Sequence, residues 1–253
     1  MAGGLAFTSH IRQALVPMFA TTRWSLVQAA GGLHSSAARQ AVGTLSEAYW
    51  YPLYAFLRRQ GCPACDCEDR LQAFFAFVLE GDVFATADPL RGRFRAFLLK
   101  TFQNFLHAEH RQATALKRGG GRIVQSLDSV EAEERYRLEP ATSETPERLF
   151  ERQWALTLLN GTLEQVRAEY VERGQEALHA ALEGHLRQNQ MQTPYAELGT
   201  SLGMTEEAVK SAAHRLRKRY RELLRAAIAD TVSDPADVDD ELRLLLQAVA
   251  AGR

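Results

Sequence analysis

The chain has 253 residues, of which 46% are hydrophobic and 24% charged, and its formal net charge is -1. This composition is that of a globular protein and excludes a disordered or collagen-like chain. The length predicts one large or two small domains, and no stretch approaches the roughly 18 consecutive apolar residues of a membrane span.

The N-terminus has a single arginine, Arg12, and lacks a continuous apolar core, so we predict no secretory signal and no membrane association. Downstream, Ala, Leu, Arg, Glu and Gln dominate and runs of β-branched residues are absent, which predicts an all-α fold. The helix-breaking run that begins at Gly119 is followed by polar, acidic sequence, so we predict a flexible acidic linker over 119–146. The predicted organisation is two small helical domains joined by this polar linker: a first domain over 1–118, a second with a helix-turn-helix over 147–232, and an acidic tail with a short helix over 233–253.

Three cysteines form a tight cluster, Cys62-Pro-Ala-Cys65-Asp-Cys67. An odd, clustered set is a poor disulfide framework and fits a reducing cytoplasm, where we expect the protein to reside. Cys62 and Cys65 have zinc-ligand spacing and Cys67 could be a third ligand, but no second pair exists and no histidine lies nearby. Incidental thiols are the favoured interpretation, with a metal site or a redox switch as the alternative, and we predict no cofactor.

Two basic segments are balanced by acidic ones. The segment from Arg91 to Arg122 has eight basic residues and one acid, a net of +7, and the segment from Lys210 to Arg225 has seven and one, a net of +6. Two cationic segments on separate predicted domains favour two contacts with one polyanion over two solvated helix faces. In the first segment, a polar stripe on the helix predicted over 93–111 is a candidate face for an opened nucleic-acid strand. Its members are Lys100, Asn104, His107 and Arg111.

The second basic segment follows a tight turn. A short helix is predicted from Tyr195 to Leu202, Gly203 suits a turn with positive φ, and Thr205 is a good N-cap for the next helix. Stepping this second helix at 100° per residue separates an apolar arc from a cationic arc, as a recognition helix in the major groove requires. Candidates for base edges are Glu206, Glu207, Lys210, Ser211 and His214, and candidates for phosphate are Arg215, Arg217, Lys218 and Arg221.

At this level the sequence resembles extracytoplasmic-function sigma factors of RNA polymerase. The motifs that carry the resemblance are Leu45-Ser-Glu-Ala-Tyr-Trp-Tyr-Pro-Leu-Tyr54, Asp66-Cys-Glu-Asp69 with Gln72 and Phe75, Asp88-Pro-Leu-Arg-Gly-Arg-Phe-Arg-Ala-Phe-Leu98, the segment from Tyr195 to Arg219, the start Thr21-Thr-Arg-Trp-Ser25 and the tail Val238-Asp-Asp-Glu-Leu242. The resemblance implies a non-enzymatic factor that joins core RNA polymerase, directs it to specific promoters, and recognises and melts promoter DNA to initiate transcription. The first domain would bind the polymerase clamp and the minus-ten element, and the second the minus-thirty-five element.

The resemblance also implies roles for residues. The residues that would bind polymerase are Asp66, Glu68, Asp69, Gln72 and Phe75. The residues that would read the minus-ten element are Asn104, His107 and Arg111. The melted strand would be bound by Arg91, Arg93 and Arg95. Many members carry a second acid where this chain has Ala73, so we hypothesise that an additional factor or a phosphorylation assists core binding. A phosphorylation would require a regulatory kinase, and the resemblance also makes an anti-sigma factor a candidate partner.

No catalytic motif is present: the sequence has no G-x-S-x-G, no P-loop and no H-E-x-x-H.

The stretch 147–192 is longer than the corresponding part of the family, and its leucines predict added helices. Two alternatives to a sigma factor are a helix-turn-helix DNA-binding regulator that does not join polymerase, and a metal- or redox-sensing interaction module centred on the cysteines.

Overall fold

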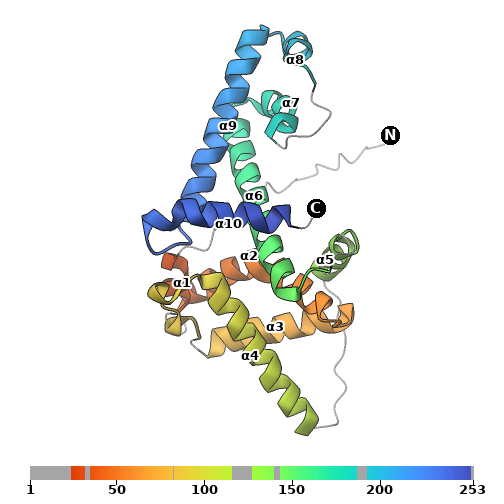
Figure 1. The fold of residues 1–253 in the computed structure, drawn as a ribbon, viewed down its shortest axis with the longest axis vertical. Coiled ribbons are helices and arrows are strands. Elements are labelled where there is room, and N and C mark those ends of the chain that lie inside the picture. The colour runs from red at the N-terminus through yellow and green to blue at the C-terminus, as the bar shows by residue number, and fades with distance from the viewer. Residues whose placement is uncertain are drawn as a thin grey trace, which may run out of the picture.

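A computed structural model describes residues 24–31, 35–81, 83–115, 127–139, 143–186 and 193–251. Within these ranges the chain forms ten α-helices and three short 3-10 helices and no β-strand (Figure 1), which confirms the all-α prediction. The start motif up to Arg23 and the triple glycine at 119–121 lie outside the described residues. The α-helices are α1 (Trp24–Ala30), α2 (Ser36–Arg59), α3 (Ala64–Glu80), α4 (Phe94–Ala115), α5 (Leu127–Arg137), α6 (Pro146–Glu172), α7 (Glu176–Leu186), α8 (Tyr195–Leu202), α9 (Glu206–Ala229) and α10 (Val238–Ala250); the 3-10 helices are η1 (Val83–Thr86), η2 (Pro89–Arg91) and η3 (Pro235–Asp237).

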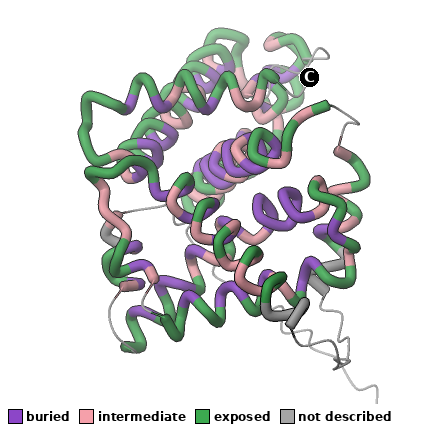
Figure 2. The backbone as a smooth tube through the Cα atoms, turned by 60° about the horizontal axis from the view of Figure 1, so that its bottom comes forward, coloured by how far each residue is buried: buried purple, intermediate pink, exposed green. Residues whose placement is uncertain are grey.

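Helix α2 is the centre of the larger of two hydrophobic cores. Its N-cap residue is Ser35, whose side chain accepts a hydrogen bond from the backbone N–H of Ala38 at 3.0 Å. Its second half is buried on nearly every side, and Tyr49, Leu53 and Phe56 have no exposed surface. Such all-round burial requires neighbours on each face, and α2 contacts α1, α3 and α6. Figure 2 shows the buried residues gathered where the helices face one another.

Helices α6 and α9 run through both cores. Phe150 at the start of α6 and Ile228 at the end of α9 belong to the larger core, together with α1 to α5 and α10. Val166 near the end of α6 and Val209 near the start of α9 belong to a smaller core with α7 and α8. The two cores therefore meet within continuous helices, whereas the sequence predicted a division at the segment 119–146.

Part of that predicted linker is helical and packed. Helix α5 contacts α2 and α3, and its Ala132 is 5% exposed. Glu133 of α5 receives hydrogen bonds from Tyr54 at 2.7 Å and from Arg58 at 2.9 Å. The charge of this segment was expected to favour solvent, but Glu133 binds a cationic group and a hydroxyl group of α2.

The acidic tail also packs on the fold. Helix α10 crosses α6 and α9 (Figure 1), and its Val238 and Leu245 belong to the larger core. Its Glu241 is 1% exposed and is therefore almost fully removed from solvent. No helix in the described ranges combines the length and the hydropathy that crossing a membrane requires.

Candidate nucleic-acid interface

Helices α8 and α9 are joined by a tight turn that depends on two glycines. Gly203 ends α8 with φ of 64°, a left-handed conformation that residues with a Cβ adopt at a cost. Gly199, one turn earlier, accepts a hydrogen bond from the Met204 N–H at 2.8 Å. A Cβ on Gly199 would lie 2.7 Å from the Met204 carbonyl oxygen, closer than a side chain tolerates. The backbone of Met204 can therefore lie this close to residue 199 of α8 only because residue 199 is glycine.

The start of α9 is fixed by local chemistry, as predicted. The Thr205 side chain accepts a hydrogen bond from the Ala208 N–H at 3.2 Å. Glu206 and Glu207 occupy the first turn, where negative charge interacts favourably with the helix dipole.

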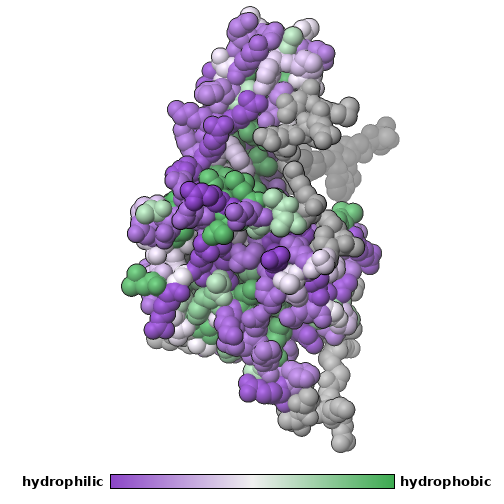
Figure 3. All heavy atoms as spheres, viewed as in Figure 1, coloured by the Kyte–Doolittle hydropathy of each residue, from purple (hydrophilic) through white to green (hydrophobic). Residues whose placement is uncertain are grey.

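The two faces of α9 separate as the periodicity predicted. Val209, Ala213 and Leu216 are buried against α7, α8 and the second half of α6. Figure 3 shows hydrophilic residues covering most of the visible surface of the arm that α7, α8 and α9 form. The solvent-exposed residues of the predicted DNA-binding set on α9 are Glu206, Glu207, Lys210, Ser211, His214, Arg215, Lys218 and Arg221.

Some cations of α9 are held by neighbouring groups. Arg217 is half-buried and donates a hydrogen bond to the Tyr195 hydroxyl of α8 at 2.9 Å, so it links the two helices. Arg219 binds Glu169 of α6 through both carboxylate oxygens, at 2.8 Å from Nε and 2.6 Å from Nη2. These hydrogen bonds lower the pKa of Glu169 below its ordinary value.

Lys210 is exposed but interacts with the first turn of its own helix. Its Nζ lies 2.7 Å from Glu206 Oε1, an i, i+4 pair, and this hydrogen bond raises the pKa of Lys210. With 53% of its side chain exposed, the ammonium can exchange this carboxylate for another acceptor.

The polar stripe of α4 is also at the surface. Lys100, Asn104, His107 and Arg111 are all exposed, while Phe94, Leu98 and Phe102 on the other side of α4 belong to the larger core. The end of α4 extends beyond the other helices in Figure 1. Arg111 Nε donates to the backbone carbonyl of His107 at 3.3 Å, which orients its side chain along the stripe.

The arginines before α4 differ from the prediction. Arg91 is 85% exposed and lies 3.4 Å from Asp88. Arg93 is 42% exposed and lies 2.5 Å from Glu241 of α10. Arg95 is only 5% exposed and pairs with Glu241 and with Glu151 of α6.

Arg95 is enclosed on another side as well. Its guanidinium lies over the ring of Trp154, 4.2 Å from the centroid. The burial and the two carboxylates around it leave no face for a nucleic acid. Of the three arginines predicted to handle a melted strand, only Arg91 presents its charge fully to solvent. The charge pattern missed this because the acids that hold Arg93 and Arg95 are distant in sequence.

The predicted polymerase-binding residues of α3 divide into two groups. Asp66, Asp69 and Gln72 are exposed. Glu68 is buried and accepts a hydrogen bond from Gln72 at 3.1 Å, and Phe75 is buried and stacks on Trp50 with ring centroids 6.1 Å apart. A partner could contact the first group directly, whereas the second shapes and supports α3.

The cysteines lie at the start of α3. Cys62 and Cys67 are buried and Cys65 is exposed, and all three are free thiols. The described part of the chain contains no group of three or more His, Cys, Asp or Glu side chains arranged to hold a metal ion.

Sequence reasoning missed three acids that organise this surface. Glu133 binds Arg58, Glu169 binds Arg219, and Glu241 binds Arg93 and Arg95. Each joins helices far apart in sequence, so no local spacing signals the pair. The one sequence feature that could have suggested such pairs is that the acidic segments balance the charge of the two basic segments.

Comparison of the chain with protein-family models, with curated proteins and with solved structures found no match.

Proposed function

We propose that this protein is a sigma factor of the extracytoplasmic-function class that directs core RNA polymerase to promoters. The observation that carries the proposal is the α8–α9 pair: a short helix, a glycine-dependent turn, and a long helix with an exposed cationic face. These features support a role for the pair as a helix-turn-helix, in which the second helix would enter the major groove.

In this proposal the first turns of α9 read base edges. Lys210, Ser211 and His214 project from the N-terminal half of the helix and are exposed. Lys218 and Arg221 lie farther along the helix, where cations neutralise phosphate. Arg217 is assigned to support rather than to DNA contact, since its guanidinium holds Tyr195.

The exposed stripe of α4 supplies the second nucleic-acid contact. A cation, an amide and an imidazole on one helix face (Lys100, Asn104 and His107) offer donors and acceptors to bases that have left the duplex. Binding of such bases offsets the free energy lost on unstacking them. We exclude Arg93 and Arg95 from this contact because both are engaged by Glu241.

The exposed residues of α3 supply the contact with polymerase. Asp66 and Asp69 present two carboxylates near the start of α3, and Gln72 follows one turn later. Carboxylates at this surface suit a basic partner such as the clamp of core polymerase, and complementary charge accelerates association and selects the partner. Such a factor acts in the cytoplasm and needs no cofactor.

The test is transcription with purified core polymerase and the full chain, followed by mapping of the start sites. We expect start sites that core polymerase alone does not use. Lys218→Ala should reduce transcription from these promoters, whereas Arg243→Ala on α10, an exposed cation outside the α9 face, should not.

Comigration with core polymerase separates this proposal from a DNA-binding regulator. A protein that binds DNA through α9 but never comigrates with core polymerase, and yields no new start site, would refute the sigma-factor proposal. Asp69→Lys should weaken comigration while leaving DNA binding by the free protein unchanged.

A further inference from the structure

The turn between α2 and α3 brings two buried thiols to the same point. Cys62 precedes the N-cap residue Pro63, and Cys67 is the fourth residue of α3. These are the two positions that pack against each other in a hydrophobic staple at a helix start. Cys62 is 6% exposed and Cys67 has no exposed surface, and both belong to the larger core beneath the turn.

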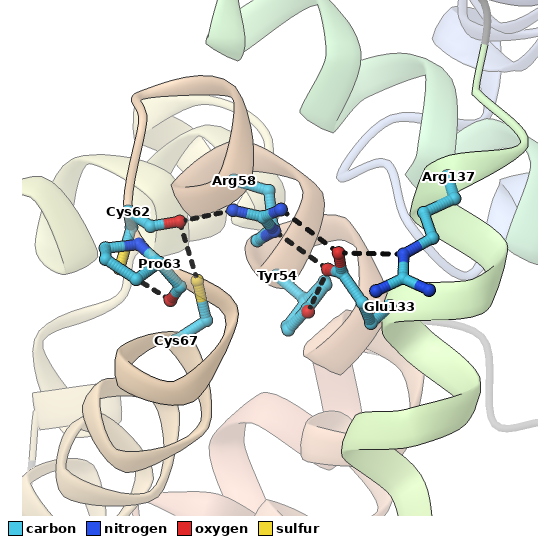
Figure 4. A network of polar contacts seen from close by, with 7 residues as sticks. All are labelled: Tyr54, Arg58, Cys62, Pro63, Cys67, Glu133 and Arg137. Carbon is cyan, nitrogen blue, oxygen red and sulfur yellow. Dashed lines mark hydrogen bonds and ion pairs between the residues drawn. The ribbon is translucent and has the colours of Figure 1, made fainter.

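One hydrogen bond joins the two cysteines, and a second joins the Cys62 thiol to the neighbouring backbone. The Cys67 thiol donates to the Cys62 carbonyl oxygen at 3.7 Å, and the Cys62 thiol donates to the Pro63 carbonyl oxygen at 3.6 Å (Figure 4). Arg58 Nη1 donates to the same Cys62 carbonyl at 2.7 Å. Arg58 of α2 therefore holds the same carbonyl group that accepts the hydrogen bond of the Cys67 thiol.

The surroundings of the three thiols shift their pKa values in different directions. The interaction between the two thiols lowers the pKa of Cys62 to about 7 and raises the pKa of Cys67. Cys62 is therefore the more readily ionised thiol of the pair. The hydrogen bond of Cys65 with Asp66 raises the pKa of Cys65, so this exposed thiol is the weaker nucleophile despite its access to solvent.

We propose that Cys62 and Cys67 form a redox-active dithiol that hydrogen peroxide converts into an intramolecular disulfide. The Cys62 thiolate attacks one peroxide oxygen, the O–O bond breaks, and Cys62 becomes a sulfenic acid as hydroxide leaves. The Cys67 sulfur then attacks the Cys62 sulfur and forms the S–S bond. The Cys67 proton and the hydroxyl group leave as water, so peroxide is reduced as the two thiols are oxidised.

The surroundings connect this site to another helix. The guanidinium that donates to the Cys62 carbonyl also binds Glu133 of α5, with Nε at 2.9 Å and Nη2 at 3.1 Å. Tyr54 donates to the same carboxylate, and Arg137 lies 3.4 Å from it (Figure 4). A covalent bond at the turn therefore acts on the contact between α2 and α5 through Arg58.

The same bond acts on the surface proposed to meet polymerase. Asp66 lies directly before Cys67 in the first turn of α3, so a disulfide restricts the backbone that carries Asp66. The effect on polymerase binding rests on the proposed function, but the thiol chemistry does not.

The experiment treats the full reduced chain with hydrogen peroxide, blocks free thiols by alkylation, and maps linkages by peptide mass spectrometry. We expect one Cys62–Cys67 linkage, about 2 Da lighter than the dithiol, with Cys65 still alkylated, and recovery of both thiols on reduction. Cys65→Ser is the matched control and should form the linkage at the wild-type rate. In Cys67→Ser, Cys62 should proceed to higher oxidation states.

Linkage mapping on the wild-type chain decides the proposal even if a variant does not fold. The proposal is overturned if Cys65 is oxidised while Cys62 and Cys67 both remain alkylatable. It is equally overturned if the linkage that forms involves Cys65, within or between molecules. Thermal unfolding is a second measurement, in which the oxidised protein should melt roughly 2–6 °C higher because the start of α3 is cross-linked.

Polymerase binding is measured separately on the oxidised and reduced forms. If the oxidised and reduced forms bind core polymerase with different affinities, the disulfide regulates polymerase binding. If the affinities are equal, the coupling of the disulfide to α3 is overturned and only the thiol chemistry stands. If the protein does not bind polymerase in either form, the proposed function fails and the linkage map still tests the dithiol.

Discussion

Glu241→Ala should be the most damaging single change in the tail. The carboxylate is 1% exposed and pairs with Arg95, itself 5% exposed, and with Arg93 at 2.5 Å. Removing one partner of a buried pair costs about 3–5 kcal/mol, because the remaining charge is left uncompensated. Arg95 keeps Glu151 at 2.5 Å and the Trp154 ring at 4.2 Å, so we expect about 2–3 kcal/mol.

Urea unfolding followed by far-UV circular dichroism measures this loss. Asp240→Ala is the matched control, since Asp240 is the preceding residue of α10, is 67% exposed and pairs only with the exposed Arg243 in the described structure. We expect the control to lie within about 0.5 kcal/mol of the wild type. A Glu241→Ala protein as stable as the control, with the same dependence on urea, would refute the buried role of this carboxylate.

Three further outcomes follow from the geometry. Gly199→Ala should destabilise the protein, by about 1–3 kcal/mol in urea unfolding, because its Cβ would lie 2.7 Å from a backbone oxygen; Gly184→Ala, with open space around its Cβ in α7, should be neutral or stabilise by up to about 1 kcal/mol. Lys218→Ala should weaken DNA binding to all sequences alike and lower the slope of log affinity against log salt by about 1 in fluorescence anisotropy titrations, and an unchanged slope would exclude a phosphate contact. Hydrogen bonds from Arg219 lower the pKa of Glu169 in the folded protein. The ionised Glu169 therefore stabilises the fold above the unfolded carboxyl pKa of about 4.3, and this stabilisation is lost as the pH falls through the lower pKa of the folded state. Glu169→Gln should make the free energy of unfolding depend less on pH in this acid range.

Local signals in the sequence predicted the helices and the faces of α9 well. The cap at Thr205, the turn at Gly203 and the spacing of Val209, Ala213 and Leu216 depend on neighbours within a few residues, so the sequence shows them directly. The all-α prediction succeeded for the same reason.

Local sequence signals could not predict which charged side chains are exposed and which are buried in ion pairs. Arg95 looks like its exposed neighbour Arg91 in sequence, and only the packing of α10 and α6 places carboxylates beside it. Helix α5 was missed because Glu133 is stabilised by Arg58, which lies 75 residues earlier. Such pairs depend on tertiary arrangement, which neither periodicity nor composition encodes.

The passage of α6 and α9 through both cores has a mechanical consequence. A helix of 24 residues such as α9 is about 36 Å long, and it is continuous from its packing against α8 to its packing against α10. Because α6 and α9 are continuous through both cores, they restrict how far the exposed cations of α9 can move relative to the α4 stripe. Any target that engages both surfaces must match the spacing between them or bend to meet it.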